Sequence, residues 1–412
     1  MPTPPGRTAY RAVTACALFV VVACSTSVAQ SARDSAGTRI AENAQPLLSG
    51  ARAPRLASVP ALELDPTKGA DYTFGRVTGV LRLADGRIFV AGGTAPQFRL
   101  FDRNGRLLHA IEERSADKSN DAGHSVAKLR GDTIAILSRR LPTLVVVAGD
   151  SLRQISAPRE TPRGPPGTIL INVLTNGGSA SANLPRPADR AVGTQWADST
   201  GFVLRDRDGA LIRDLGNMPY IALVMTKTRP TPPWLSAIGI SCSGAGRFYY
   251  GFGNTFSLMV YSERGALESI IRRVWTPTPV TPADWEHWVT DWSKLWVKER
   301  GADSIKAVQS VREEPYAFEL PAFSGCLVAQ DGTLWVREAH LDDAISAGSL
   351  TDDPLVASKW SVFNPAGRWI SDVTMPAGFG PTDIGADYVA GRFRRAPGRM
   401  TVVVYRISPD AR

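Results

Sequence analysis

A short strand–turn–strand unit recurs along the chain. In its clearest copy, the apolar runs 80–83 and 87–91 flank the turn Asp85-Gly86, and the runs 98–101 and 106–108 flank the turn Asn104-Gly105. Asp-Gly and Asn-Gly between short apolar runs are strong hairpin signals. Residues 77–111 are therefore predicted to form four antiparallel strands joined by tight turns, which is the unit of a β-propeller blade.

The third strand of this unit recurs along the whole chain. Its six copies are anchored at Phe101, Val146, Arg205, Tyr261, Phe363 and Tyr405, at intervals of 45, 59, 56, 102 and 42 residues. The longest interval fits either a seventh blade or one blade with an insertion, and a helical pattern at 281–300 favours the insertion. The sequence predicts an all-β fold: a six-bladed β-propeller with a short helical insertion, about 281–314, between blades four and five.

The last copy of the repeat is a third strand, so the sixth blade lacks its fourth. Residues 55–64, just before the first blade, are available to fill that place. Such a clasp would cover a strand edge that is otherwise unpaired and would tie the two ends of the ring together.

The first 29 residues resemble an export signal. Arg7 and Arg11 precede the apolar run 12–23, which is too short to span a bilayer as a helix. Two processing sites compete: a lipobox that ends at Cys24, with lipid on its thiol, and ordinary cleavage before Gln30. We predict lipidation of Cys24, a linker at 30–54 and the propeller at 55–412, in an extracytoplasmic protein that is anchored to the envelope or secreted.

With these repeats, the chain resembles six-bladed propellers of the NHL-like and TolB-like kind. More narrowly, it is similar to exported bacterial propeller proteins of unassigned role, which open with a stretch like 34–43 and close with stretches like 384–389 and 403–406. The resemblance covers most of residues 34–412 and implies a fold rather than a chemistry, because one propeller scaffold hosts many functions.

The chain shows no concentrated set of reactive residues. It contains no nucleotide-binding loop, zinc pattern, EF-hand or Gly-x-Ser-x-Gly elbow, and its four histidines are not at metal-ligand spacing. The acidic stretch at 342–353 could bind calcium, but its spacing matches no loop of known type and favours a solvated loop. The net charge of +8 is scattered without a basic stripe, which excludes nucleic acid as the expected partner. We therefore predict no catalytic residue, metal or cofactor.

The insertion carries the most informative local pattern. Thr281-Pro282-Ala283-Asp284 is a helix start, and four tryptophans follow at steps of three, four and four: Trp285, Trp288, Trp292 and Trp296. This spacing places the four indoles on one narrow stripe of a helix. The stripe is predicted to pack the helix onto the propeller; the alternative is an aromatic wall that stacks a sugar or aromatic ligand.

Two cysteines remain outside the signal, Cys242 and Cys326. Counted from the turn glycines Gly246 and Gly332, both offsets are even, so the two thiols are predicted to leave equivalent faces of neighbouring blades. This register favours two separate buried thiols over a disulfide, although a bulge at 241–244 would reverse the parity.

Two function classes fit the sequence. The first is a monomeric, non-enzymatic scaffold of the cell envelope that binds a protein, peptide or saccharide and meets the membrane only through a lipid anchor. The second is a propeller hydrolase or lyase of the gluconolactonase type, which holds a divalent cation on the axis with carboxylate and amide side chains. The expected inner strands begin near Val80, Val126, Ile240 and Leu327 and supply no obvious acid, so the scaffold is favoured.

Overall fold

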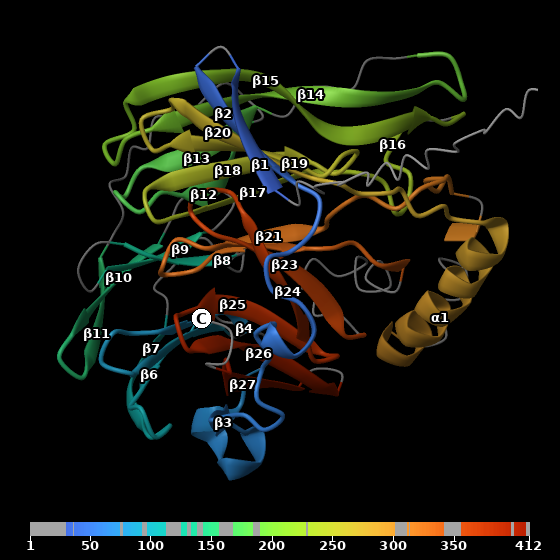
Figure 1. Ribbon diagram of the computed structural model, residues 1–412. Helices are drawn as coiled ribbons and strands as arrows, with labels where there is room; N and C mark the ends of the chain where they lie inside the picture. The colour runs from blue at the N-terminus through green and yellow to red at the C-terminus, as the bar shows by residue number, and fades with distance from the viewer. Residues whose placement is uncertain are drawn as a thin grey trace, which may run out of the picture.

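The computed structural model shows a chain built mainly of short antiparallel strands (Figure 1). It describes residues 30–35, 37–74, 77–92, 97–112, 125–129, 133–137, 143–155, 168–183, 190–227, 230–300, 311–312, 314–341, 356–396 and 399–408. The predicted signal and Cys24 lie outside these residues, as does the acidic stretch 342–353.

The described residues form six sheets, which are numbered here in chain order. Sheet 1 holds β4 (Val77–Arg82), β5 (Ile88–Gly92), β6 (Gln97–Phe101) and β7 (Leu107–Glu112). Sheet 2 holds β8 (Ser125–Lys128), β9 (Thr133–Leu137), β10 (Thr143–Ala148) and β11 (Ser151–Ile155). Sheet 3 holds β12 (Thr168–Val173), β13 (Ser179–Asn183), β14 (Gln195–Arg205), β15 (Leu211–Met225) and β16 (Pro230–Thr231).

Sheets 4 to 6 continue the pattern. Sheet 4 holds β17 (Gly239–Gly244), β18 (Arg247–Phe252), β19 (Ser257–Ser262) and β20 (Leu267–Arg273), and is extended by β2 (Thr38–Asn43) and β1 (Gln30–Ser35). Sheet 5 holds β21 (Gly325–Val328), β22 (Leu334–Arg337), β23 (Ser358–Phe363) and β24 (Trp369–Met375). Sheet 6 holds β25 (Phe379–Ile384), β26 (Tyr388–Ala396), β27 (Arg399–Arg406) and β3 (Leu62–Leu64). Each of the six repeat anchors lies on the third strand of a different sheet.

Alternation along each strand explains why the sheets pack face to face. In β5, Ile88 and Val90 join a core cluster with residues of sheet 6, whereas Phe89 and Ala91 join a cluster with residues of sheet 2. Because successive side chains of a strand point to opposite faces, one strand serves two interfaces. Each core cluster between the sheets is therefore shared by two neighbouring sheets.

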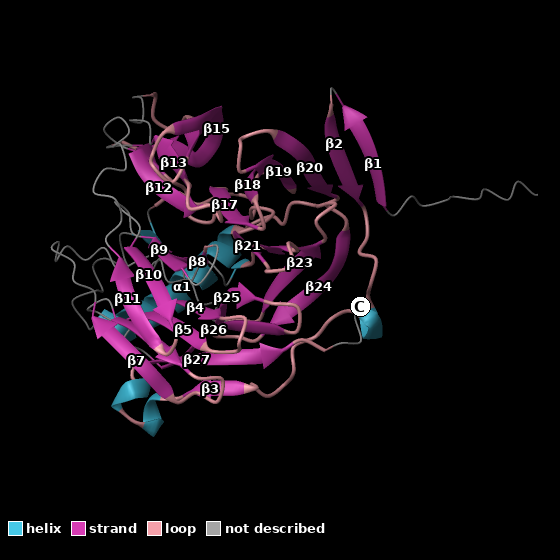
Figure 2. Cartoon of the chain, turned by 90° about the vertical axis from the view of Figure 1, so that its left-hand side faces the viewer, coloured by secondary structure: helices cyan, strands magenta, loops and turns pink. Residues whose placement is uncertain are grey.

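The sheets are arranged around a common centre (Figure 2). Sheets 2 and 3 meet through β9 and β12. For the other neighbouring sheets, the first strands contact one another, and these contacts include β25 of sheet 6 with β4 of sheet 1. The turn between the third and fourth strands of one sheet packs against the fourth strand of the sheet before it. Gly105 lies against β3, Gly265 against β15 and Gly367 against β20. Because sheets 6 and 1 meet as sheets 3 and 4 do, the arrangement closes into a β-propeller-like ring.

The predicted clasp is confirmed. β3 pairs antiparallel with β27, and Glu63 lies opposite Val403. Backbone hydrogen bonds from Ala61 N to Val404 O (2.7 Å) and from Ala57 N to Arg406 O (2.9 Å) extend the pairing. An N-terminal strand thus completes the C-terminal sheet.

Residues 30–43, assigned to a linker from the sequence, form a hairpin instead. β1 and β2 pair with each other, and β2 pairs parallel with β20 at the outer edge of sheet 4. Asn43 is 2% exposed; its Nδ2 donates to Arg272 O (2.9 Å) and Gly367 O (3.0 Å), and its Oδ1 accepts from Trp369 N (2.8 Å). The hairpin therefore ties sheet 4 to sheet 5.

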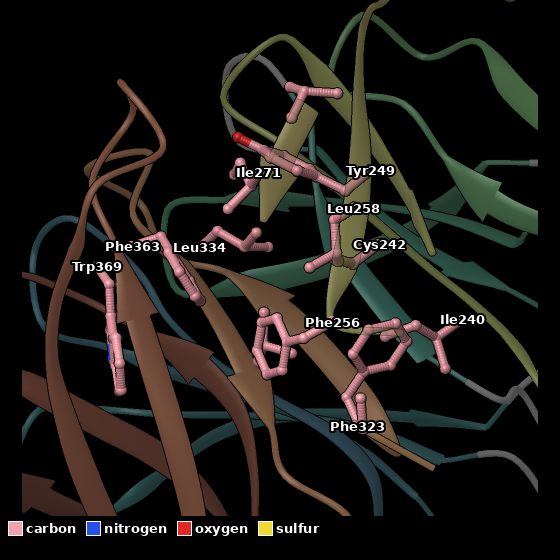
Figure 3. Packing of buried hydrophobic residues seen from close by; sticks show 13 residues of the cluster. Ile240, Cys242, Tyr249, Phe256, Leu258, Ile271, Phe323, Leu334, Phe363 and Trp369 are labelled. Carbon is pink, nitrogen blue, oxygen red and sulfur yellow. The ribbon is translucent and has the colours of Figure 1, made fainter. Parts of the chain in front are cut away.

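The prediction of two separate thiols is wrong. Cys242 and Cys326 form a disulfide between β17 and β21, with Cα atoms 5.8 Å apart. Figure 3 shows Cys242 in the packed interface between sheets 4 and 5, with Phe256, Leu258 and Phe323 nearby.

The error has a definite cause in the two turns. The β17–β18 turn has two residues, 245–246, whereas the β21–β22 turn has three, 330–332. A glycine ends each turn. An offset counted from that glycine therefore includes one more turn residue in the β21–β22 hairpin than in the β17–β18 hairpin. Cys242 is two residues from Gly244, which pairs with Arg247 at its turn, and Cys326 is three residues from Ala329, whose amide donates to Thr333 O at its turn. The parities are opposite, and the thiols face each other across the interface.

Helix α1 (Pro282–Arg300) lies between β20 and β21 in the chain. Three short 3-10 turns, Gly50–Arg52, Pro66–Lys68 and Ala70–Tyr72, complete the described elements. In the described part of the chain, no helix has the length and apolar character needed to cross a membrane.

Candidate functional site

Helix α1 begins with a reciprocal cap. The Asp284 amide donates to Thr281 Oγ1 (3.2 Å), and Asp284 Oδ2 accepts from the Thr281 amide (2.9 Å) and hydroxyl (2.7 Å). These bonds from Thr281 lower the pKa of the Asp284 carboxyl. The cap satisfies backbone donors that would otherwise lack partners and fixes where the helix starts.

The tryptophan stripe of α1 is packed inward. Trp285, Trp288 and Trp292 are buried; the backbone of Trp296 continues the helix, but its side chain lies outside the described part. The rings stack in a row, with centroids 4.9 Å apart for Trp285–Trp288 and 6.0 Å for Trp288–Trp292. The three buried indoles offer no open face to a ligand in this conformation, so the geometry supports packing as their role.

The stripe packs on neighbouring connections rather than on the strands of the sheets. The aromatic cluster, as it is called below, consists of Trp285, Trp288, Val289, Trp292 and Val311, with Trp234, Leu235 and Tyr316 at its margin. Trp234 precedes sheet 4 and Tyr316 follows α1. Two backbone bonds hold these segments together: Trp234 N to Pro315 O (2.9 Å) and Ala317 N to Trp234 O (2.8 Å). In Figure 1, α1 stands at the right, beside the sheets.

Sequence reasoning missed the partners of the stripe. Trp234 lies 51 residues before Trp285 and Tyr316 lies 31 residues after it, and no helical period connects either of them to the stripe. One signal was present: each of these aromatic residues directly follows a proline, Pro233 or Pro315, in a segment that forms no helix. Proline favours extended backbone, and an extended segment can lie along a helix.

A second group of polar side chains bridges sheets 4 and 5. The Arg273 side chain, 9% exposed, forms an ion pair with Glu338 and a hydrogen bond with Ser361. Its guanidinium lies 4.3 Å from the ring centre of Trp369 and 4.6 Å from that of Phe256, which is cation–π geometry.

Carboxylates complete this group. Lys359 Nζ lies 3.2 Å from Glu338 Oε1 and 3.0 Å from Asp372 Oδ2, and Ser361 Oγ donates to Asp372 Oδ1 (2.9 Å). Burial raises the pKa of Glu338, but the Arg273 hydrogen bond and charge outweigh it, and the pKa is lowered overall. The carboxyl groups are engaged with cations of the protein, so the group stabilises the junction of sheets 4 and 5.

A third group lies on the first strands. Asp383 Oδ2 accepts from Arg82 N (2.8 Å) and from the Tyr388 hydroxyl (2.7 Å), and Gln330 Nε2 lies 3.3 Å from Oδ1. Burial raises the pKa of Asp383 despite these bonds. Thr382 also bonds the amide and carbonyl of Val80 at 2.9 Å. These bonds join sheet 6 to sheet 1, where the ring closes.

The described first strands carry one acidic residue, Asp383. Among the described residues, no group of three or more His, Cys, Asp or Glu side chains could hold a metal ion. Of the described histidines, His109 accepts from Leu152 N (3.2 Å), and the exposed His287 lies 3.4 Å from Asp291 on α1. His124 lies outside the described part.

Comparison with known proteins gives distant matches of fold. No protein-family model and no curated protein matches the chain. Among solved structures, it is similar to a Bacteroides fragilis protein named as exported (9% identity, 90% of this chain and 99% of that one, TM-score 0.47). It is also similar to a member of the DUF4221 family from Bacteroides vulgatus (10% identity, 87% and 99%, TM-score 0.47). A third match is virginiamycin B lyase from Staphylococcus aureus (8% identity, 84% and 98%, TM-score 0.35). Likenesses at these levels carry no argument about function.

Proposed function

We propose that this chain is an exported, six-bladed β-propeller of the NHL-like or TolB-like kind that serves in the cell envelope as a monomeric, non-enzymatic binding scaffold. Each of the six sheets corresponds to one blade. The disulfide supports export, because such bonds persist in oxidising compartments. The apolar run 12–23 supports it independently, and a lipid on Cys24 would hold the protein at a membrane.

The observation that carries the proposal is the aromatic cluster. It is a core of its own, separate from the clusters between the sheets, and it belongs to the longest connection between two blades. The junction of sheets 4 and 5, which this connection links, is held by the disulfide, the Arg273 group and the β1–β2 hairpin. Binding residues are often carried on connections that a rigid scaffold positions, and this insertion has that relation to the ring.

The gluconolactonase-type alternative requires several carboxylate or amide side chains that converge on the axis. Asp383 is the acid that the described first strands supply, and its carboxyl group already accepts from Arg82, Tyr388 and Gln330. Its bonds are those of a residue that joins two blades. They do not favour the enzyme.

Binding arrays with matched variants test the proposal. Residues 30–412 are applied to a synthetic peptide array and a glycan array, and hydrogen–deuterium exchange locates the contact of each bound probe. We expect protection at 282–294 and 314–320. Phe318→Ala should weaken binding, because this ring is 67% exposed at the end of the aromatic row. Leu211→Ala is the control, since Leu211 is 57% exposed on blade three.

Two results would contradict the proposal. One is equal binding by the Phe318 and Leu211 variants, with protection on another face of the ring. The other is turnover of a sugar lactone that depends on added Ca²⁺ or Mn²⁺ and is lost in Asp383→Asn.

A further inference from the structure

The aromatic cluster contains a buried donor without an acceptor. Trp288 is 0% exposed, and its indole Nε1 has no hydrogen-bond partner among the described residues. Buried polar groups are nearly always paired, because an unpaired donor has lost its bonds to water without replacement. The packing of the stripe requires the Trp288 ring, but it does not require the N–H group, since a phenyl ring would stack equally well.

A strained residue lies at the margin of the same cluster. Leu235 has φ +64°, and the left-handed region is rare for a bulky residue. Leu235 follows Trp234, whose ring centre lies 5.0 Å from that of Trp288. Strained backbone tends to occur where a ligand is bound or a segment switches. The unpaired donor and the strain are thus two independent features of one site.

The cluster continues to the surface through ring contacts. Trp285 stacks on Tyr316 at 4.8 Å, and Tyr316 meets the exposed Phe318 edge-on at 6.1 Å. Between α1 and the segment 314–318, the described contacts are those of side chains, together with the exposed Glu286–Arg312 ion pair (2.7 Å) beside them. The start of the helix is tied to this segment, because Val280, two residues before α1, donates its amide to Phe318 O (2.7 Å). No described backbone bond joins residues 282–300 themselves to residues 314–318, so the helix can pivot about its first turn without breaking a sheet.

We propose that the aromatic cluster binds a neutral oligosaccharide, with one hydroxyl or ring oxygen accepting the Trp288 Nε1–H. This inference rests on the proposed function and names its ligand class. Indole and phenol rings stack on the apolar faces of pyranose rings, and sugar oxygens supply the acceptor that the N–H lacks. A quaternary ammonium ion would also suit an aromatic cage, but it carries no acceptor for this donor. The ligand enters where α1 meets Tyr316 and Phe318.

The test uses maltohexaose, cellohexaose and chitohexaose as probes, with choline as the cationic comparison. On residues 30–412 labelled with ¹⁵N, the Trp288 indole resonance should shift downfield and exchange more slowly with one of the hexaoses. Trp288→Phe keeps a stacked ring and removes the donor, so affinity for that sugar should fall about tenfold, the size of one lost hydrogen bond. Trp285→Phe removes a similar ring volume from the same row but leaves the unpaired Trp288 donor in place, so it should lose less sugar affinity than Trp288→Phe.

The Trp288 and Trp285 variants should also differ in stability when no ligand is bound. Trp288→Phe removes an unpaired donor and should lower the urea midpoint less than Trp285→Phe does. The proposal is overturned if no hexaose shifts the Trp288 resonance, if choline alone shifts it, or if both variants lose sugar affinity equally. A peptide that protects the insertion when no sugar binds would refute the oligosaccharide inference but would still support the scaffold function. If no peptide, glycan or hexaose contacts the insertion, both the oligosaccharide inference and the scaffold function are refuted.

Discussion

The side chain of Asn43 is expected to be one of the strongest single contributions to the junction of sheets 4 and 5. At 2% exposure it makes three hydrogen bonds of 2.8–3.0 Å: one to Arg272 O within sheet 4, and two, to Gly367 O and from Trp369 N, that cross to sheet 5. Each such bond contributes about 1 kcal/mol net, and truncation leaves buried partners without a bond. Asn43→Ala should therefore lower the free energy of unfolding by about 3–4 kcal/mol, measured from the urea midpoint of residues 30–412.

Two further variants make the reasoning refutable. Asn43→Asp keeps the acceptor for Trp369 N but turns a carboxylate toward two carbonyl oxygens, so it should be at least as damaging at neutral pH. Asp34→Ala, on the exposed strand β1 of the same hairpin, should change stability by less than about 0.5 kcal/mol. An Asn43→Ala protein within 1 kcal/mol of the parent, on the same scale as the control, would show that the hairpin does not hold the junction.

Other changes have equally definite expectations. Thiol counting on the denatured, non-reduced protein should find neither Cys242 nor Cys326 free, and replacing both with serine should cost about 2–5 kcal/mol; a free thiol would refute the pairing. Trp292→Ala should cost about 3–5 kcal/mol, and an unchanged melting temperature would refute its packing role. The raised pKa of Asp383 means that its contribution to stability is full at low pH and is lost as pH rises through the folded-state pKa, so Asp383→Asn should flatten that decline. Glu338 has a lowered pKa, so its contribution is present at neutral pH and is lost as pH falls through the folded-state pKa, and Glu338→Gln should make the acid decline of a stability–pH profile shallower.

Local signals predicted the short strands and tight turns of the four-stranded sheets. Gly105, Gly265 and Gly367 adopt positive φ at the turns where the repeat placed them, because these turns require a left-handed residue that glycine adopts without strain. The clasp could also be inferred, since a missing fourth strand leaves an edge that another strand must cover. The turns depend on the residues within them, and the clasp follows from a count of the strands.

Such local signals did not predict the contacts between segments that are distant in the chain. The disulfide depended on a one-residue difference in turn length, which a glycine alone does not reveal. The hairpin at 30–43 is polar and reads as a linker, and its order comes from pairing with β20, more than 220 residues away. Asp383 and Tyr388 help to join sheet 6 to sheet 1, and this role depends on contacts with Arg82, about 300 residues earlier in the chain, that the sequence does not reveal.

The scaffold function presupposes a closed ring, and a cross-link across its seam tests this most directly. Glu63 and Val403 are directly opposite in β3 and β27, where antiparallel partners bring Cα atoms within disulfide range. Glu63→Cys with Val403→Cys should give a disulfide-linked peptide pair after mild oxidation of the folded protein. Glu63→Cys with Val402→Cys should not, because neighbouring residues of a strand face opposite sides. Free thiols at 63 and 403 in the folded protein would contradict the closure on which the account depends.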